Sequence, residues 1–165
     1  MTTINQPHIK NTLTFAIPAV CGVIIDILSK WLVFSQVKTY ETITLIPGLL
    51  NIVRSENKGV VFGILPGKTN AFIILSVIAI ITIVCIYLWS DRSVIKSNVA
   101  LGMVLAGAAG NLWDRIWLKG VRDFIDFHIG NAYHWPTFNI ADSLICIGVF
   151  LMAITSFFTS KREQP

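Results

Sequence analysis

The chain has 165 residues, of which 54% are hydrophobic and 13% are charged, and its mean hydropathy is +0.69. A soluble domain carries about 25% charged residues and lacks apolar runs of nearly 20 residues. The composition therefore excludes a soluble globular enzyme, and also a disordered chain, which needs low hydrophobicity. The 13 Lys and Arg residues that give the net charge of +4 are scattered. This favours anionic lipid headgroups over nucleic acid as a partner.

Four apolar segments are long enough to cross the ~30 Å hydrocarbon layer of a membrane, which takes about 20 residues. The expected spans are residues 13–34, 71–89, 99–117 and 138–158. The third span is rich in Gly and Ala, as close helix packing in lipid prefers. We therefore expect residues 1–165 to form a single all-α membrane domain, a bundle of four transmembrane helices.

An even number of spans puts both termini on one side of the membrane. The basic residues at the two ends of the chain lie beside the spans, so we expect the termini in the cytoplasm. Residues 35–70 and 118–137 then form the extracytoplasmic segments. Residues 39–54 show a weak alternation and a Pro47-Gly48 turn, which predicts a small sheet on the membrane surface. The length of the 35–70 segment suggests a functional role, and we expect it to act as a platform or lid.

Polar residues gather at the ends of the spans that meet at this same face. They form three clusters with i, i+3, i+4 spacing, namely Asp26-Ser29-Lys30, Asn111-Asp114-Arg115 and Asn139-Asp142-Ser143. This spacing puts each cluster on one side of its helix. An ionisable residue in a span costs about 2.5–3.5 kcal/mol on insertion scales and faces the bundle interior. Three such clusters at one depth therefore predict a functional site.

The chemistry that these clusters allow is general acid and base catalysis by two aspartates. Carboxylates that share a partly dry site cannot both ionise cheaply, so one keeps a proton while the other activates water. The pattern alone does not select the pair, and each candidate has a structural alternative. Asp123 could cap a loop, Asp126 competes for the same role, Asp114 could pair with Arg115, and Asn139 could cap the fourth span.

Metal and nucleophilic chemistry have less support in the sequence. The three histidines, His8, His128 and His134, are dispersed, so we expect no metal and no cofactor. Ser29 and Lys30 are adjacent, which argues against a Ser/Lys dyad. The rival from another class is a small transporter or proton-relay subunit. That function predicts polar residues through the whole membrane depth, whereas the acidic residues here stop at one face.

Five motifs in order resemble those of the bacterial lipoprotein signal peptidase family, signal peptidase II. The stretches at 110–115, 121–124 and 138–143 carry the resemblance, together with Asp26-Ile27-Leu28-Ser29-Lys30 and Asn57-Lys58-Gly59-Val60-Val61-Phe62. Any one motif would be weak, but their order and spacing cover almost the whole chain. By this resemblance, the sequence is identified as a member of that family.

The resemblance implies an aspartic endopeptidase of the bacterial cytoplasmic membrane that removes the signal peptide of diacylglyceryl-modified prolipoproteins. Asp123 and Asp142 match the family's catalytic aspartates. Other matched positions imply substrate binding or support, and these are Asn57, Gly59, Asn111, Arg115, Asn139, Asp26 and Lys30. We expect a monomer in contact with membrane lipids.

Overall fold

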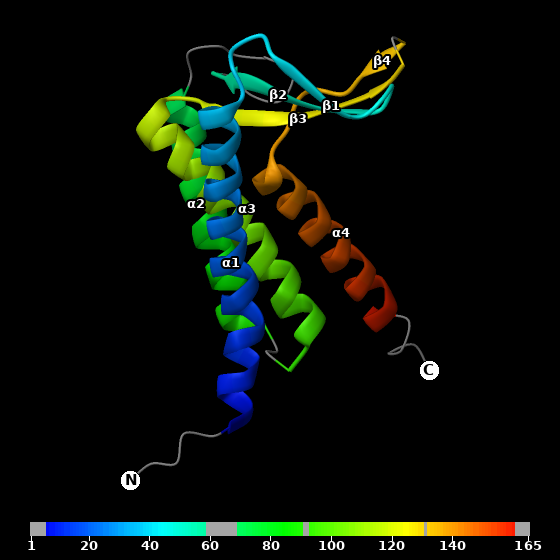
Figure 1. Cartoon of the computed structure of the whole chain (residues 1–165). Helices are drawn as coiled ribbons and strands as arrows, with labels where there is room; N and C mark the ends of the chain where they lie inside the picture. Colours follow the sequence, from blue (N-terminus) through cyan, green and yellow to red (C-terminus); the bar gives the residue numbers. More distant parts are fainter. Residues whose placement is uncertain (1–5, 59–68, 91–92, 131, 161–165) are drawn as a thin grey trace.

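The computed structural model describes residues 6–58, 69–90, 93–130 and 132–160 of the chain. The helices are α1 (Gln6–Gln36), α2 (Thr69–Trp89), α3 (Ile95–Leu118) and α4 (Ile140–Ser160). The strands are β1 (Thr42–Ile46), β2 (Leu50–Asn57), β3 (Val121–Ile129) and β4 (Tyr133–His134). The sheet lies over one end of the helices, and α1 begins and α4 ends at the opposite end (Figure 1).

Helix α3 lies at the centre of the helical part and packs against α1, α2 and α4. Small residues permit this close approach, because Ala100, Ala106 and Ala108 are buried on α3. At Gly107, a Cβ atom would collide with the backbone carbonyl oxygen of Ala141 on α4. Close packing of this kind is the usual way in which helices associate in lipid.

The distribution of polarity is the reverse of that in a soluble protein. The largest fully buried side chains are mostly polar or charged, and they are Lys30, Leu101, Asn98, Asn139, Asp26, Asp114 and Asp123. Large apolar side chains such as Ile24, Ile78 and Phe150 are more than half exposed on the helix surfaces. The described part of the chain contains three helices that are long and apolar enough to cross a membrane, Asn11–Gln36, Thr69–Trp89 and Ile140–Phe158.

The four strands form one antiparallel sheet in the order β1-β2-β3-β4. The predicted turn at Pro47-Gly48 connects β1 to β2, and Gly48 has a φ of 75°, which glycine adopts without strain. Strand β3 is also bonded to the residue that precedes α4. Phe138 donates its amide to Ile125 at 3.0 Å and accepts the amides of Phe124 and Ile125 at 3.0 and 2.8 Å. This junction holds the start of α4 against β3.

The structure corrects the expected fold in two places. The chain is mostly helical rather than all-α, because residues 121–129, expected in a connecting segment, form β3 in the middle of the sheet. Its Val, Phe and Ile residues favour a strand, but Arg122, Asp123 and Asp126 interrupt the apolar pattern. The fourth helix begins at Ile140 rather than at 138, since Phe138 pairs with β3.

The count of four spans is not confirmed, since α3 is absent from the three apolar helices found among the described residues. Its 24 residues include Lys96, Asn98, Asn111, Asp114 and Arg115, which lower its hydropathy.

We predict that Gly107→Ala destabilises the protein, because the added methyl group would overlap the backbone of Ala141. Overpacking costs about 1–3 kcal/mol, which exceeds the gain in helix propensity of about 1 kcal/mol. The thermal unfolding midpoint in detergent should fall by several degrees. Ala153→Val, which adds carbon to an exposed position on α4, serves as the control and should leave the midpoint nearly unchanged. An equal shift in the two variants would contradict the packing argument.

Candidate active site

Asn139 joins the two predicted catalytic aspartates. Its side-chain Nδ2 donates to Asp123 Oδ1 at 2.7 Å, and its backbone amide donates to Asp142 Oδ2 at 3.2 Å. Asn139 is fully buried, and Asp123 is 2% exposed. Residues from β3 and from the first turn of α4 are therefore held together by one amide side chain and one backbone N–H group.

The position of Asp142 follows from the way α4 begins. Asn139 Oδ1 accepts the backbone amide of Asp142 at 3.0 Å, while the Asp142 carboxylate accepts that of Asn139. This reciprocal pair is a capping box, which satisfies two amides of the first helical turn. The alternative interpretation of Asn139 as a helix cap is thus confirmed. The same cap fixes the Asp142 carboxylate at the positive end of the helix dipole.

Asn111 of α3 and Asn57 of β2 complete the hydrogen bonds of the two carboxylates. Asn111 Nδ2 donates to Asp142 Oδ1 at 2.8 Å, and its Oδ1 accepts Asn139 Nδ2 at 3.2 Å and Lys30 Nζ at 3.1 Å. Asn57 Nδ2 donates to Asp123 Oδ2 at 3.2 Å. The three asparagines orient the carboxylates without adding charge.

Asp26 and Lys30 belong to a buried charge network beside the predicted catalytic aspartates. Lys30 Nζ lies 2.7 Å from Asp26 Oδ2 and 3.5 Å from Asp114 Oδ2, and all three side chains are fully buried. Asp26 Oδ1 also accepts the backbone amide of Ala141 at 2.9 Å, which ties α1 to α4. Such a network stabilises only while it is complete, because removal of one partner leaves an unpaired buried charge.

The predicted ion pair between Asp114 and Arg115 is not present among the described residues. Asp114 instead binds Arg122 of β3, with Oδ1 2.7 Å from Nη2 and Oδ2 3.2 Å from Nε. Arg115 donates to the backbone oxygen of Asn111 at 3.3 Å and interacts electrostatically with Asp142 and Asp123, and less strongly with Asp114. The expectation was wrong because β3 brings a better-oriented guanidinium to Asp114, which sequence spacing alone does not reveal.

Asp123 has a strongly perturbed acidity. Burial raises its pKa to about 7, and the negative charge of Asp142 adds to the increase, against the opposing hydrogen bonds from Asn57 and Asn139. A carboxyl group with this pKa is still partly protonated at neutral pH. Residues with such shifted acidity at a polar site are candidates for acid or base catalysis.

Asp126, the competing aspartate, lies apart from this site. It accepts a hydrogen bond from Asn51 Nδ2 at 3.0 Å. Its carboxylate oxygens lie 3.5 Å from His128 Nδ1 and 3.4 Å from His134 Nδ1. Ser29 and Ser143 bond to backbone oxygens of their own helices. Gly59, the remaining predicted residue, lies outside the described residues.

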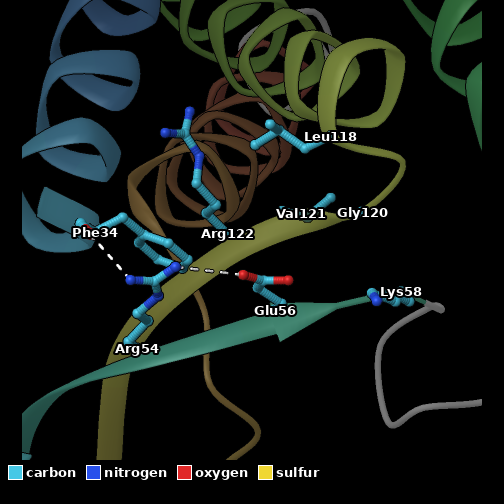
Figure 2. Close-up of a pocket in the computed structure, with 8 residues that line it drawn as sticks. All are labelled: Phe34, Arg54, Glu56, Lys58, Leu118, Gly120, Val121 and Arg122. Carbon is cyan, nitrogen blue, oxygen red and sulfur yellow. Dashed lines mark hydrogen bonds and ion pairs between the residues drawn. The ribbon is translucent and has the colours of Figure 1, made fainter. Parts of the chain in front are cut away.

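A cavity of about 290 Å³ opens beside the site and is lined by residues of α1, β2, Lys58, the α3–β3 link and β3. Figure 2 shows that Arg54 points towards Phe34 and Glu56. Arg54 Nη2 lies 3.7 Å from Glu56 Oε1, within ion-pair distance. Arg122 rises from β3 towards the helices in the same view. Because side chains alternate along a strand, Arg122 lines this cavity while Asp123 contacts Asn57 and Asn139.

Comparisons with known proteins all indicate the same family. A family model described as signal peptidase (SPase) II matches residues 18–158. The lipoprotein signal peptidase of Photorhabdus laumondii subsp. laumondii is 38% identical over 165 residues, 96% of each chain. That of Solibacter usitatus is 40% identical over 145 residues, which cover 84% of this chain and 87% of that one.

A solved structure also resembles the fold. It is described as a bacterial membrane enzyme determined by the in meso method at 2.3 Å resolution, and it has a TM-score of 0.83 at 35% identity. The similarity covers 90% of each chain. The chain therefore belongs to the signal peptidase II family.

Proposed function

We propose that this membrane protein is an aspartic endopeptidase that removes signal peptides from diacylglyceryl-modified prolipoproteins, with Asp123 and Asp142 as its catalytic pair. The family match supports the reaction and its substrate class. The observation that carries the assignment of residues is the Asn139 bridge between the two carboxylates. Asp26 and Lys30 stabilise the packing of the helices. The residues that surround the catalytic pair are Asn57, Asn111, Arg115 and Asn139.

The environments of the two carboxylates support different roles. Asp142 accepts two N–H groups and lies at the N-terminus of α4, where the helix dipole is positive. Asp123 has a pKa of about 7, so it can hold the proton that the pair shares. Asp142 is therefore assigned as the base and Asp123 as the acid.

In the proposed reaction, Asp142 takes a proton from water, and the resulting hydroxide attacks the scissile carbonyl carbon. Asp123 gives its proton to the carbonyl oxygen, which yields a neutral gem-diol. Asp142 then gives its proton to the leaving nitrogen as the C–N bond breaks, and Asp123 takes a proton from the gem-diol. The products are a carboxylic acid and an amine, and the original protonation of the pair is restored.

The polar residues support the peptidase over the transporter alternative. The acidic residues that belong to the network, Asp26, Asp114, Asp123 and Asp142, meet at the end of the helices next to the sheet. A proton or ion path needs polar groups along the membrane depth. Helix α2, in contrast, contains no charged residue.

We also propose that α3 is a fourth membrane span and that the sheet lies on the extracytoplasmic side of the inner membrane. The 24 residues of α3 extend for about 36 Å, enough to cross the membrane. Its polar residues Asn98, Asn111 and Asp114 are buried, so they contact protein rather than lipid. The exposed apolar faces of the helices suit lipid tails, and the basic residues of the cavity suit anionic headgroups. The platform or lid function of residues 35–70 is proposed for β1 and β2, since residues 59–68 lie outside the described part.

We predict that Asp123→Asn and Asp142→Asn each lower kcat/KM for cleavage of a diacylglyceryl-modified prolipoprotein by about 10²–10⁴-fold, the usual contribution of general acid and base catalysis. Asparagine keeps the shape of the side chain but cannot exchange the proton. Glu56→Gln is the matched control, because this exposed carboxylate neighbours Asn57 without contacting the pair. Full activity in either aspartate variant, measured on folded protein, would refute the assignment.

The acidity of Asp123 gives a second prediction. Because Asp123 must be protonated, kcat/KM should fall above pH 7, about tenfold per pH unit, as Asp123 loses its proton. Asn57→Ala removes a hydrogen bond that lowers this pKa, so the alkaline limb should move to higher pH. Asn51→Ala is the control, since Asn51 also lies on β2 but donates to Asp126. A limb that stays in place in Asn57→Ala would argue against Asp123 as the acid.

The proposed topology can be tested by cysteine labelling of intact spheroplasts. Starting from a variant without Cys21, Cys85 and Cys146, single cysteines are placed at Tyr40 and Ser93, which are exposed at opposite ends of the helices. A membrane-impermeant maleimide should label Tyr40→Cys, and should label Ser93→Cys only after the membrane is permeabilised. The reverse pattern would place the sheet in the cytoplasm.

A further inference from the structure

The hairpin formed by β3 and β4 gathers two of the chain's three histidines next to an aspartate. His128 and His134 are direct partners across the two strands. Asp126 Oδ2 lies 3.5 Å from His128 Nδ1, and Asp126 Oδ1 lies 3.4 Å from His134 Nδ1. One potential ligand atom from each residue lies within 4.8 Å of the other two.

These separations fit the coordination of a metal ion. Zinc binds imidazole nitrogen and carboxylate oxygen at about 2.0–2.2 Å, so tetrahedral geometry separates neighbouring ligand atoms by about 3.3–3.6 Å. The two distances from Asp126 fall within that interval, one measured from each carboxylate oxygen. Two imidazoles and one carboxylate also form a ligand set that zinc prefers, with a fourth position left for water.

The buried histidine provides an independent observation. The His128 side chain is 9% exposed, and its Nδ1 atom makes no hydrogen bond to any residue that the structure describes. A buried polar atom without a hydrogen-bond partner is costly and calls for an explanation. A metal ion between His128 and Asp126 would satisfy this atom.

Asn51 and the orientation of the two imidazole rings are compatible with metal binding at this site. Asn51 donates to Asp126 Oδ2 at 3.0 Å, which orients the carboxylate in the way that outer-shell partners do in metal sites. The two imidazole rings lie nearly parallel, at an interplanar angle of 13°. A metal ion must lie close to the plane of each ring, so one ring has to rotate. His134 is 58% exposed, and its rotation would exchange the 3.4 Å contact of its Nδ1 atom with Asp126 for a bond to the ion.

We propose that Asp126, His128 and His134 bind one zinc ion and thereby fasten β4 to β3. The proposal departs from the expectation of no metal, which rested on the dispersed positions of the histidines in the sequence. The site is separate from the catalytic pair, because the three residue steps along β3 from Asp123 to Asp126 span about 10 Å. The proposal therefore stands or fails independently of the peptidase function.

Zinc binding to the full-length protein provides the test. The protein is purified in detergent with an affinity tag that contains no histidine, treated with a chelator, and titrated with Zn²⁺ by calorimetry. We expect one Zn²⁺ per chain and a higher thermal unfolding midpoint in its presence. His134→Ala and Asp126→Asn should weaken binding by about tenfold or more.

Tyr133→Ala is the matched control, because it removes an exposed ring next to His134 and no metal ligand. Its zinc affinity should equal that of the unsubstituted protein. Two results would overturn the proposal. One is the absence of saturable one-to-one binding, and the other is an affinity that is unchanged in folded His134→Ala and Asp126→Asn.

Discussion

The rest of the site depends on the hydrogen bonds that Asn139 makes. It caps α4 through its side-chain oxygen and holds Asp123 through its nitrogen, while its backbone N–H group binds Asp142. A helix start within a protein must satisfy its free amides, and here the residues that do so also form the site. The residue that starts α4 therefore also holds the carboxylate pair together.

The charges around this amide are balanced in two groups, which Asn111 connects through hydrogen bonds to Lys30 and Asp142. Lys30 and Arg122 neutralise Asp26 and Asp114 in a network that connects α1, α3 and β3. The remaining pair, Asp123 and Asp142, carries one net negative charge when it shares a proton, and Arg115 supplies one positive charge nearby. This balance suits a site with little water, because an unpaired buried charge is strongly destabilising. Under the proposed mechanism, it also gives the pair a reason to retain one proton.

In the proposed topology, this polar assembly lies where peptide, water and lipid meet. The exposed surface of the helices is apolar, whereas the polar side chains face inwards and towards the sheet. The junction of Phe138 with β3 sets the depth of Asp123 relative to Asp142. A peptide held in the bilayer by its lipid could approach sideways, without a channel through the whole bundle. The sheet would cover the site from the aqueous side.

The sequence alone determined the membrane class, the helical segments and the convergence of three polar clusters, because hydropathy and helical spacing are local properties. Its motifs also indicated the family and the two aspartates. The tertiary structure decided what depends on pairing between distant segments. Residues 121–129 became a strand because β2 and Phe138 bond to them, and this strand gave Asp114 its partner Arg122. Asp126 and His128 share one face of β3, but only the β3–β4 hairpin could bring His134 to them, since contacts across strands leave no periodic signal in the chain.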